Sequence, residues 1–203
     1  MTAPTPRPPF TIVSRETVWQ GFCRVERIVF DQATRAGDTR RLTFEMESHG
    51  RAAAVLAYDP KRREAVLVRQ LRLPPGLDGE DPMSLEIIAG LLDRTTEDPE
   101  ATARREAHEE AGLDLDTVEL IAATRPSPGL SSEKVWLYLA EVDLDRARVA
   151  DGGGLAHEGE DIEVVILPLA DLAALVDEGE RLDMKTLLAV QTLRVRRPEL
   201  FGA

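Results

Sequence analysis

Residues Ala52 to Tyr58 form a nearly continuous apolar run, and this run constrains the fold more than any other part of the sequence. A second apolar run, Ala65 to Val68, follows after the polar residues Asp59 to Arg63. A strand that is covered on both faces is apolar throughout, whereas a half-buried strand alternates. Two such runs joined by a short turn therefore predict a buried β-hairpin.

Shorter patterns on both sides of the hairpin predict further elements. Alternating or apolar stretches favour strands over residues 17–30, 41–47, 85–89, 118–124, 135–142 and 162–167. Residues 74–82 are rich in Pro, Gly and Asp and predict a loop, and the helical patterns cover residues 98–111, 170–177 and 184–196. Strands around one central helix, with helices after them, favour an α/β or α+β domain. The sequence has no G-x-G-x-x-G and no P-loop, which argues against a parallel dinucleotide-binding sheet.

The N-terminal part has a different character. Residues 1–9 carry four prolines and little to bury, which predicts a loose tail. Residues 10–49 are expected to form a small antiparallel β lobe, and residues 50–203 the main domain.

Composition excludes several classes of protein. The 203 residues carry 25 Lys and Arg against 37 Asp and Glu, a formal net charge of −12, which argues against binding to nucleic acid. Cys23 is the one cysteine, so an internal disulfide and a zinc site with several cysteines are excluded. The chain has no apolar run of the ~20 residues that a membrane span needs, and no signal peptide is recognised. We expect a cytoplasmic protein that does not bind membranes.

The segment from Gly90 to Leu113 carries the chemistry. Asp98 is a suitable N-cap, Pro99 suits the first helical position, and Gly112 can close the helix in a left-handed conformation. The helix between them places three carboxylates on one side, Glu106, Glu109 and Glu110. Like charges at this spacing destabilise a helix unless they are compensated, and a hard divalent cation such as Mg²⁺ is the simplest compensation. The alternative interpretation is a solvated acidic face.

This segment resembles the Nudix box, G-x5-E-x7-R-E-U-x-E-E-x-G-U, in which U is apolar. Residues Arg105 to Leu113 match completely, but six residues instead of five separate Gly90 from Glu97. The resemblance implies an α/β/α sandwich with a mixed sheet and hydrolysis of a nucleoside diphosphate linked to another group. It implies Mg²⁺, with Mn²⁺ as a substitute, and metal ligands at the Ala89 carbonyl and at the side chains of Glu106, Glu109 and Glu110.

Two later segments are similar to motifs of ADP-ribose pyrophosphatases within this family. One is Ser127 to Glu133, and the other is Gly154 to Ile162. The second segment implies that Glu158 is the general base and that Glu160 is a metal ligand. Its three preceding glycines suggest a mobile loop that approaches once substrate and metal are bound. The resemblance also implies a homodimer that uses the N-terminal lobe, and substrate contacts at Arg41, Arg72, Leu91, Ser127, Gly129 and Glu133.

The segment Asp183 to Thr186 indicates a different substrate. It resembles the D-x-K-T segment of GDP-mannose pyrophosphatases, in which the Lys contacts the substrate, here Lys185. A helix N-terminus capped by Asp183 is the alternative interpretation. The sequence therefore predicts a nucleoside diphosphate-sugar pyrophosphatase, with ADP-ribose as the leading substrate and GDP-mannose or another nucleotide sugar as the second. A non-catalytic Nudix-fold sensor is a more remote alternative.

Overall fold

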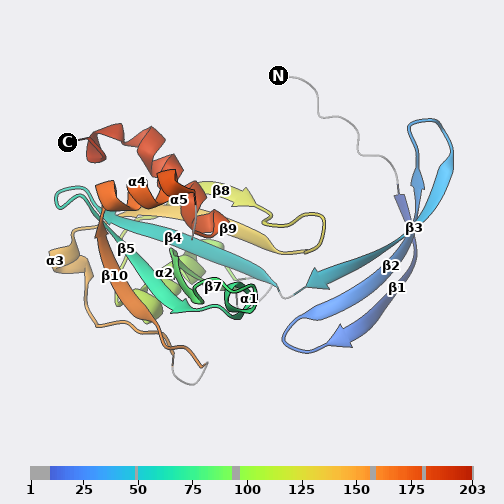
Figure 1. Cartoon of the computed structure of the whole chain (residues 1–203), viewed down its shortest axis with the longest axis horizontal. Helices are drawn as coiled ribbons and strands as arrows, with labels where there is room; N and C mark the ends of the chain where they lie inside the picture. Colours follow the sequence, from blue (N-terminus) through green and yellow to red (C-terminus); the bar gives the residue numbers. More distant parts are fainter. Residues whose placement is uncertain (1–9, 49, 93–96, 156–158, 180–181, 203) are drawn as a thin grey trace. The chain divides into compact units, whose positions relative to one another are not determined.

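The computed structural model describes residues 10–48, 50–92, 97–155, 159–179 and 182–202 (Figure 1). Its contacts divide the chain into two compact units. Residues 1–50 and 125–133 form the first unit, and residues 51–124 and 134–203 form the second. The expected tail, residues 1–9, lies outside the described residues.

The second unit is built on one mixed sheet. Its main strands, in spatial order, are β10 (Glu163–Pro168), β5 (Glu64–Leu71), β4 (Arg51–Asp59), β9 (Lys134–Glu141) and β8 (Glu119–Thr124). Two short strands, β6 (Met83–Glu86) and β7 (Ile88–Leu91), pair with β5 and β4 respectively. The β4–β9 pair is parallel and the other pairs are antiparallel. The mixed sheet predicted from the sequence is confirmed.

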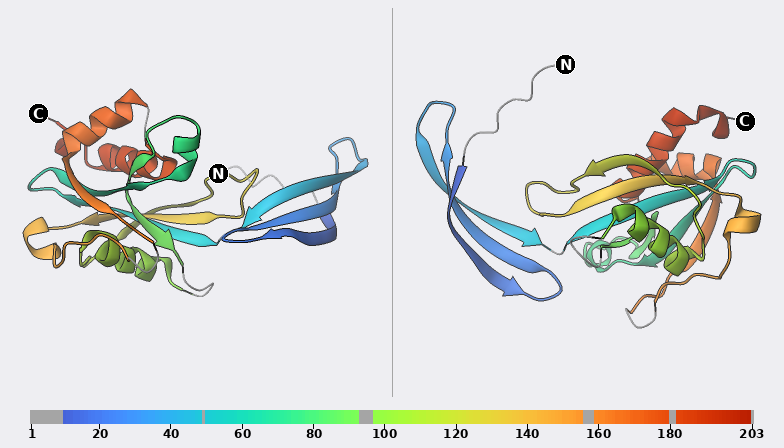
Figure 2. Two further views of the ribbon diagram at one scale, coloured as in Figure 1. Left: turned by 60° about the horizontal axis from the view of Figure 1, so that its bottom comes forward. Right: turned by 180° about the vertical axis from the view of Figure 1, so that it is seen from behind.

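Helices cover both faces of this sheet (Figure 2). Helix α2 (Pro99–Ala111) packs on one face, and α4 (Leu169–Glu178) and α5 (Met184–Arg196) pack on the other. Strand β4 lies between the two layers and alternates between them: Leu56 faces α4 and α5, whereas Val55 faces α2. Because both sides of β4 are covered, every residue from Ala52 to Asp59 is buried. This explains the continuous apolar run and confirms the α/β/α sandwich.

Three short helical elements complete this unit. They are α1 (Leu73–Leu77), α3 (Leu144–Ala147) and the 3-10 helix η2 (Pro198–Leu200). Helix α1 overlaps the start of residues 74–82, where a loop was predicted. The single strand predicted over residues 85–89 is in fact β6 and β7, separated at Ile87. Within the described ranges, no helix is long and apolar enough to cross a membrane.

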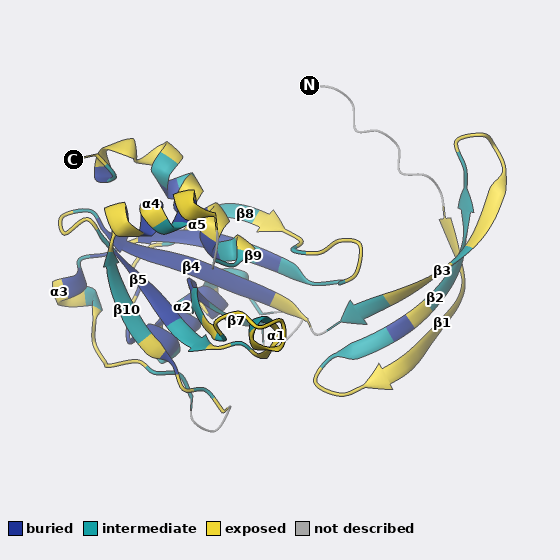
Figure 3. Cartoon of the chain, in the orientation of Figure 1, coloured by how far each residue is buried: buried dark blue, intermediate teal, exposed yellow. Residues whose placement is uncertain are grey.

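The first unit is a three-stranded antiparallel sheet of β1 (Phe10–Gln20), β2 (Arg24–Ala33) and β3 (Thr39–Ser48). The single strand predicted over residues 17–30 is wrong, because the chain turns at residues 21–23 and β1 runs back along β2. Every residue of β1 is exposed, so no alternation of burial marks this strand (Figure 3). On one face, Phe30 packs edge-on against both Phe10 and Phe44.

Residues 125–133 belong to the first unit through bonds to the end of β3. The Glu47 N–H donates to the Leu130 carbonyl at 2.9 Å, and the Ser132 N–H donates to the Glu47 carbonyl at 2.9 Å. The Ser131 hydroxyl donates to the Glu47 carboxylate at 2.6 Å. The grouping places three residues with predicted substrate contacts beside the N-terminal sheet: Ser127, Gly129 and Glu133.

Candidate active site

Helix α2 carries the acidic cluster, and its ends are fixed as the sequence predicts. The Asp98 side chain accepts from the Glu100 N–H at 3.1 Å, Pro99 occupies the first turn, and Gly112 closes the helix at φ 64°. The small residues Ala103, Ala107 and Ala111 are fully buried against the sheet. This close packing draws the neighbouring carboxylates into the protein.

Two of these carboxylates are buried with few partners. Burial raises the pKa of Glu106 to about 7, and the charges of Glu109 and Glu160 add to this rise, while Arg105 opposes it. Burial raises the pKa of Glu110 to about 8, an effect that Glu106 and Glu160 increase and the Ala89 N–H opposes. Like charges held close together in a poorly solvated place disfavour ionisation. Both carboxyl groups therefore keep their protons to a higher pH than free carboxyl groups do, and a cation placed beside them would favour their ionised forms.

Strand β7 passes directly over the helix. The Ala89 N–H donates to the Glu110 carboxylate at 3.0 Å, and Arg105 donates to the Leu91 carbonyl at 3.1 Å. At Gly90, an added Cβ would overlap the Glu106 carboxylate. The glycine therefore lets the backbone of β7 approach the helix closely, and the predicted residues Ala89 and Leu91 lie beside the carboxylates.

The glycine-rich segment after α3 is joined to the end of α2. The Gly153 N–H donates to the Glu110 carbonyl at 2.9 Å, and the Gly154 N–H donates to the Glu109 carbonyl at 3.1 Å. These are carbonyls that a helix leaves unpaired in its last turn. The Leu155 N–H then holds the Glu160 carboxylate at 2.8 Å. The described part of this segment is thus hydrogen-bonded to the helix, and movement of the loop on ligand binding stays a prediction.

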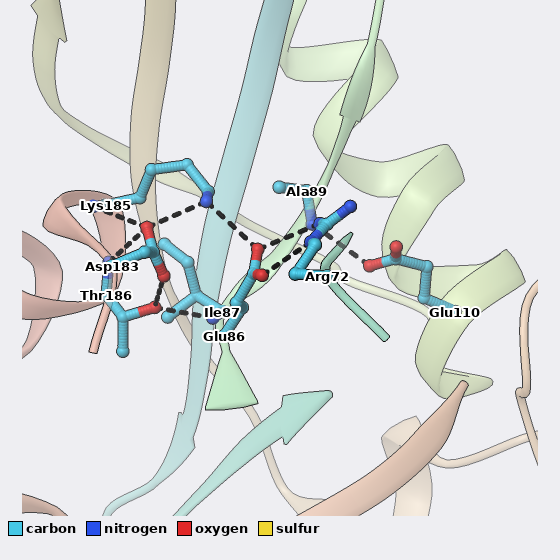
Figure 4. A network of polar contacts seen from close by, with 8 residues as sticks. All are labelled: Arg72, Glu86, Ile87, Ala89, Glu110, Asp183, Lys185 and Thr186. Atoms are coloured by element: carbon cyan, nitrogen blue, oxygen red, sulfur yellow. Dashed lines mark hydrogen bonds and ion pairs between the residues drawn. The ribbon is translucent and has the colours of Figure 1, made fainter. Parts of the chain in front are cut away.

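A second polar cluster lies on the other side of residues 86–89 (Figure 4). The Arg72 Nε and Nη2 atoms donate to the two Glu86 oxygens at 2.7 and 3.0 Å. The Lys185 Nζ atom donates to Glu86 at 3.2 Å and to Asp183 at 2.8 Å. Burial alone raises the pKa of Glu86, but the Arg72 hydrogen bonds and the two cationic charges outweigh it and lower this pKa to about 2.

The start of α5 is fixed to the same strand. The Asp183 side chain accepts from the backbone N–H of both Lys185 and Thr186, so it is the N-cap that the sequence analysis offered as the alternative. The Thr186 hydroxyl donates to Asp183 at 2.6 Å and accepts from the Ile87 N–H at 2.9 Å. Capping and a substrate contact by Lys185 are compatible, because different atoms serve them.

The predicted site residues therefore fall into three sets. Ala89, Glu106, Glu109, Glu110 and Glu160 lie together around α2, with Leu91, Arg72 and Lys185 in the same unit. Four lie in the first unit: Arg41, Ser127, Gly129 and Glu133. Arg41 forms an ion pair with Asp31 at 2.8 Å. Glu158, the predicted general base, lies outside the described residues.

Glu86 is a site residue that the sequence did not predict. Its side chain is only 5% exposed, and it bonds to two residues that were predicted to contact substrate. A single Glu in the strand segment Leu85 to Ala89 gives no signal by itself. A charged residue inside an otherwise apolar strand was the available clue, because a buried charge needs a partner.

The residues around α2 fit a divalent cation. Among the described residues, no three acidic, His or Cys side chains already form a metal cage. Carboxylate oxygens are nevertheless the ligands that hard cations prefer. The two buried carboxylates with raised pKa values would be relieved by positive charge. A Cβ at position 90 would fill the space that the Glu106 carboxylate occupies. The identities of the ligands stay a prediction.

Comparisons with known proteins match most of the chain. The model of the NUDIX domain matches residues 48–189. GDP-mannose pyrophosphatase of Cronobacter sakazakii is 33% identical over 186 residues, which cover 91% of this chain and 95% of the relative. The Salmonella arizonae protein of the same name is 34% identical over 186 residues, with the same coverage.

A solved structure agrees over the whole length. The crystal structure of an ADP compounds hydrolase covers 98% of both chains with a TM-score of 0.70 at 21% identity, which supports the fold. Nudix hydrolases generally use divalent metal ions. Motif, fold and relatives agree, and the chain belongs to the Nudix hydrolase family.

Proposed function

We propose that this Nudix hydrolase uses Mg²⁺ to cleave the diphosphate bond of a nucleoside diphosphate-sugar. We propose GDP-mannose as its preferred substrate. The observation that carries the proposal is a cationic pair, Arg72 and Lys185, across residues 86–89 from the acidic side chains of α2 (Figure 4). A diphosphate needs both: positive side chains for its own oxygens, and carboxylates for the cation that it shares.

In the proposed reaction, Glu106, Glu110, Glu160 and the Ala89 carbonyl hold the metal, with Glu109 as a further ligand. When bound, Mg²⁺ neutralises charge on the diphosphate and makes a water molecule more acidic. Arg72 binds a phosphate oxygen, and Glu158 accepts the proton of the attacking water. Water adds to one phosphorus and the bridging oxygen leaves with the other phosphate. GDP-mannose would thus give GMP and mannose 1-phosphate.

Two observations favour GDP-mannose as the first substrate. The relatives that are 33% and 34% identical over nearly the whole chain are named GDP-mannose pyrophosphatases. Lys185, the residue that resembles their substrate-binding Lys, lies 3.2 Å from Glu86 and shares that carboxylate with Arg72. ADP-ribose, which would give AMP and ribose 5-phosphate, is the second candidate, because the segments Ser127 to Glu133 and Gly154 to Ile162 resemble those of ADP-ribose pyrophosphatases.

We also propose that the first unit joins two copies of the chain. Its sheet exposes large apolar side chains on one face, among them Phe10 at 62% and Phe44 at 54%. The same face borders a cavity of about 400 Å³ that the segment 128–131 completes. Apolar surface of this kind usually marks an interaction site. In a homodimer the substrate contacts proposed for Arg41, Ser127, Gly129 and Glu133 would complete the site.

A substrate panel tests the proposal. The purified chain is incubated with Mg²⁺ and GDP-mannose, ADP-ribose, other nucleotide sugars or nucleoside triphosphates, and phosphate is measured after treatment with a phosphatase. We expect kcat/KM to be highest for GDP-mannose. A higher value for ADP-ribose would reverse the order of the two candidates. Binding of nucleotide sugars by calorimetry without turnover would identify a sensor, and the absence of both would reject the proposed function.

A further inference from the structure

We propose that Glu86 is a positioning residue that holds Arg72 and Lys185 as one cationic unit facing the diphosphate. This inference rests on the proposed function, because it assigns the two cations to that substrate. It adds a residue that no sequence motif marks. The first support is geometric. The Glu86 carboxylate accepts from Nε and Nη2 of Arg72 at 2.7 and 3.0 Å, and from Nζ of Lys185 at 3.2 Å.

The hydrogen bonds to Glu86 leave the Nη1 atom of Arg72 available to a ligand. Nε and Nη2 bind Glu86, whereas Nη1 makes no hydrogen bond within the part of the chain that the structure describes. The Arg72 side chain is still 42% exposed, although the Glu86 side chain is only 5% exposed. A fork fixed on one edge has a defined direction for its remaining N–H groups. Glu86 therefore orients the guanidinium group of Arg72 and leaves it accessible to a ligand.

The backbone next to Glu86 is hydrogen-bonded to two helices. Ile87, the next residue, donates its N–H to Thr186 on α5, and Ala89 donates its N–H to Glu110 on α2. Residues 86–89 are thus bonded on one side to the helix that carries Lys185 and on the other to the helix that carries the acidic cluster. The position of both cations relative to the carboxylates is set through this short segment.

The accessibility of Arg72 beside a buried carboxylate supports a positioning role over a purely structural one. Burial of a carboxylate with two cations is costly, and well-packed apolar residues of similar size often serve stability as well or better. The Arg72 side chain stays 42% exposed although its carboxylate partner is buried, so a ligand can still reach the guanidinium group. Lys185, 22% exposed, already has Asp183 as a partner at 2.8 Å. Glu86 and Asp183 balance the charges of Arg72 and Lys185, so the two cations lie close together without a net repulsion.

The test is a set of double-mutant cycles measured as kcat and KM with Mg²⁺ and the best substrate of the panel. Glu86→Gln should raise KM by about 10-fold or more, since a charge-assisted bond is lost, while kcat changes less. The same substitution should have little further effect in an Arg72→Met, Lys185→Met background. An equal effect of Glu86→Gln in both backgrounds would overturn the proposal.

Two controls separate positioning from stability. Asp177→Asn removes an exposed carboxylate that pairs with Arg194 at 2.7 Å, and it should leave kcat and KM unchanged. Asp59→Asn removes a buried carboxylate that accepts three backbone N–H groups, and it should lower Tm without coupling to Arg72. If Glu86→Gln does not fold, the cycle of Arg72→Lys with Lys185→Arg replaces it. Additive effects of those two substitutions would overturn the proposal.

Binding of inorganic pyrophosphate, measured by calorimetry with the same variants, tests the role of Glu86 separately from the proposed enzymatic function. If the wild-type chain cleaves no nucleotide sugar but the variants weaken pyrophosphate binding non-additively, the proposed function fails and the role of Glu86 is supported. If the wild-type chain is active and the effects are additive, the role of Glu86 fails and the proposed function is retained.

Discussion

Glu106 and Glu110 are the residues in which burial and charge conflict most. Both are less than 9% exposed, although each is a carboxylate with another carboxylate one helical turn away. Glu106 forms an ion pair with Arg105 at 2.9 Å, and Glu110 accepts from the Ala89 N–H at 3.0 Å, whereas Glu86 receives two nitrogens of Arg72. Buried carboxylates of this kind lower the stability of the fold. Proteins keep them at functional sites, where a bound cation supplies the positive charge that balances them.

Neutralising these two carboxylates should abolish turnover. We expect Glu110→Gln and Glu106→Gln each to lower kcat by ~100-fold or more, because each removes a proposed metal ligand. Glu100→Gln is the matched control on the same helix, since Glu100 pairs with Arg104 at 2.8 Å on the exposed side. Steady-state assays with Mg²⁺ provide the test, and activity near that of the wild type in Glu110→Gln would contradict the assignment.

The raised pKa values also predict how metal-free stability depends on pH. A carboxyl whose pKa is higher in the folded state than the ordinary 4.5 binds extra protons when folded, so its contribution to stability is lost as pH rises. With folded pKa values of about 7 and about 8, the loss should extend from pH 4.5 to above pH 8. Thermal melts in EDTA should show a Tm that falls over this range. Adding Mg²⁺ should raise Tm most at the alkaline end, and Glu110→Gln should flatten the slope.

At the residue level, the sequence predicted the acidic cluster and its caps but missed Glu86. The spacing of Glu106, Glu109 and Glu110 follows from helical geometry, so local pattern was enough. The partners of Glu86 are Arg72, 14 residues before it, and Lys185, 99 residues after it. No local periodicity encodes contacts of that kind.

Among the elements, the glycine-rich segment after α3 has the sharpest steric requirement. Gly112 and Gly152 both have positive φ, at 64° and 74°, and a Cβ on either would overlap backbone atoms of the other segment. Each glycine therefore lets the end of α2 and residues 150–154 touch. Glu160 depends on this contact for its place near Glu106 and Glu110.

Substitution of Gly152 tests this dependence. Gly152→Ala should destabilise the fold by about 1–3 kcal/mol, from backbone strain and from overlap with α2. It should also lower kcat in the molecules that remain folded, because Glu160 is displaced. Gly37→Ala is the matched control, since Gly37 has φ 93° but an added Cβ would meet nothing within 4 Å. Equal Tm and kcat for the two variants would contradict a specific role of Gly152.

The elements that the sequence predicted well are those with a strong local signal. The buried hairpin, α2 and α5 are where the apolar pattern and the caps place them. Strand β1 was not recognised as a separate strand, because all of its residues are exposed and its apolar and polar residues do not alternate in burial. The break at Ile87 was missed for another reason, since it depends on a bond to Thr186 from a distant helix.

For the whole molecule, we expect a homodimer that forms through the exposed apolar face of the first unit. Light scattering after size-exclusion chromatography should give twice the mass of the chain. Phe44→Glu should shift the protein toward the monomer, since it places a charge on that face, and it should weaken kcat/KM if the partner completes the site. Glu163→Gln, an exposed residue of the second unit that pairs with Arg69 at 3.1 Å, should leave the dimer intact. A monomeric wild type would reject this proposal.

The bonds on either side of residues 86–89 have a consequence for how this protein tolerates changes in length. That stretch acts as a fixed spacer between two helices, so losing or gaining one residue there would turn side chains toward the wrong layer. The chain already has an extra residue between Gly90 and Glu97, relative to the usual pattern. One-residue deletions and insertions should therefore be tolerated after Leu91 but not within residues 86–89. Changes of loop length that are meant to alter substrate preference should therefore be made after Leu91 and not within residues 86–89.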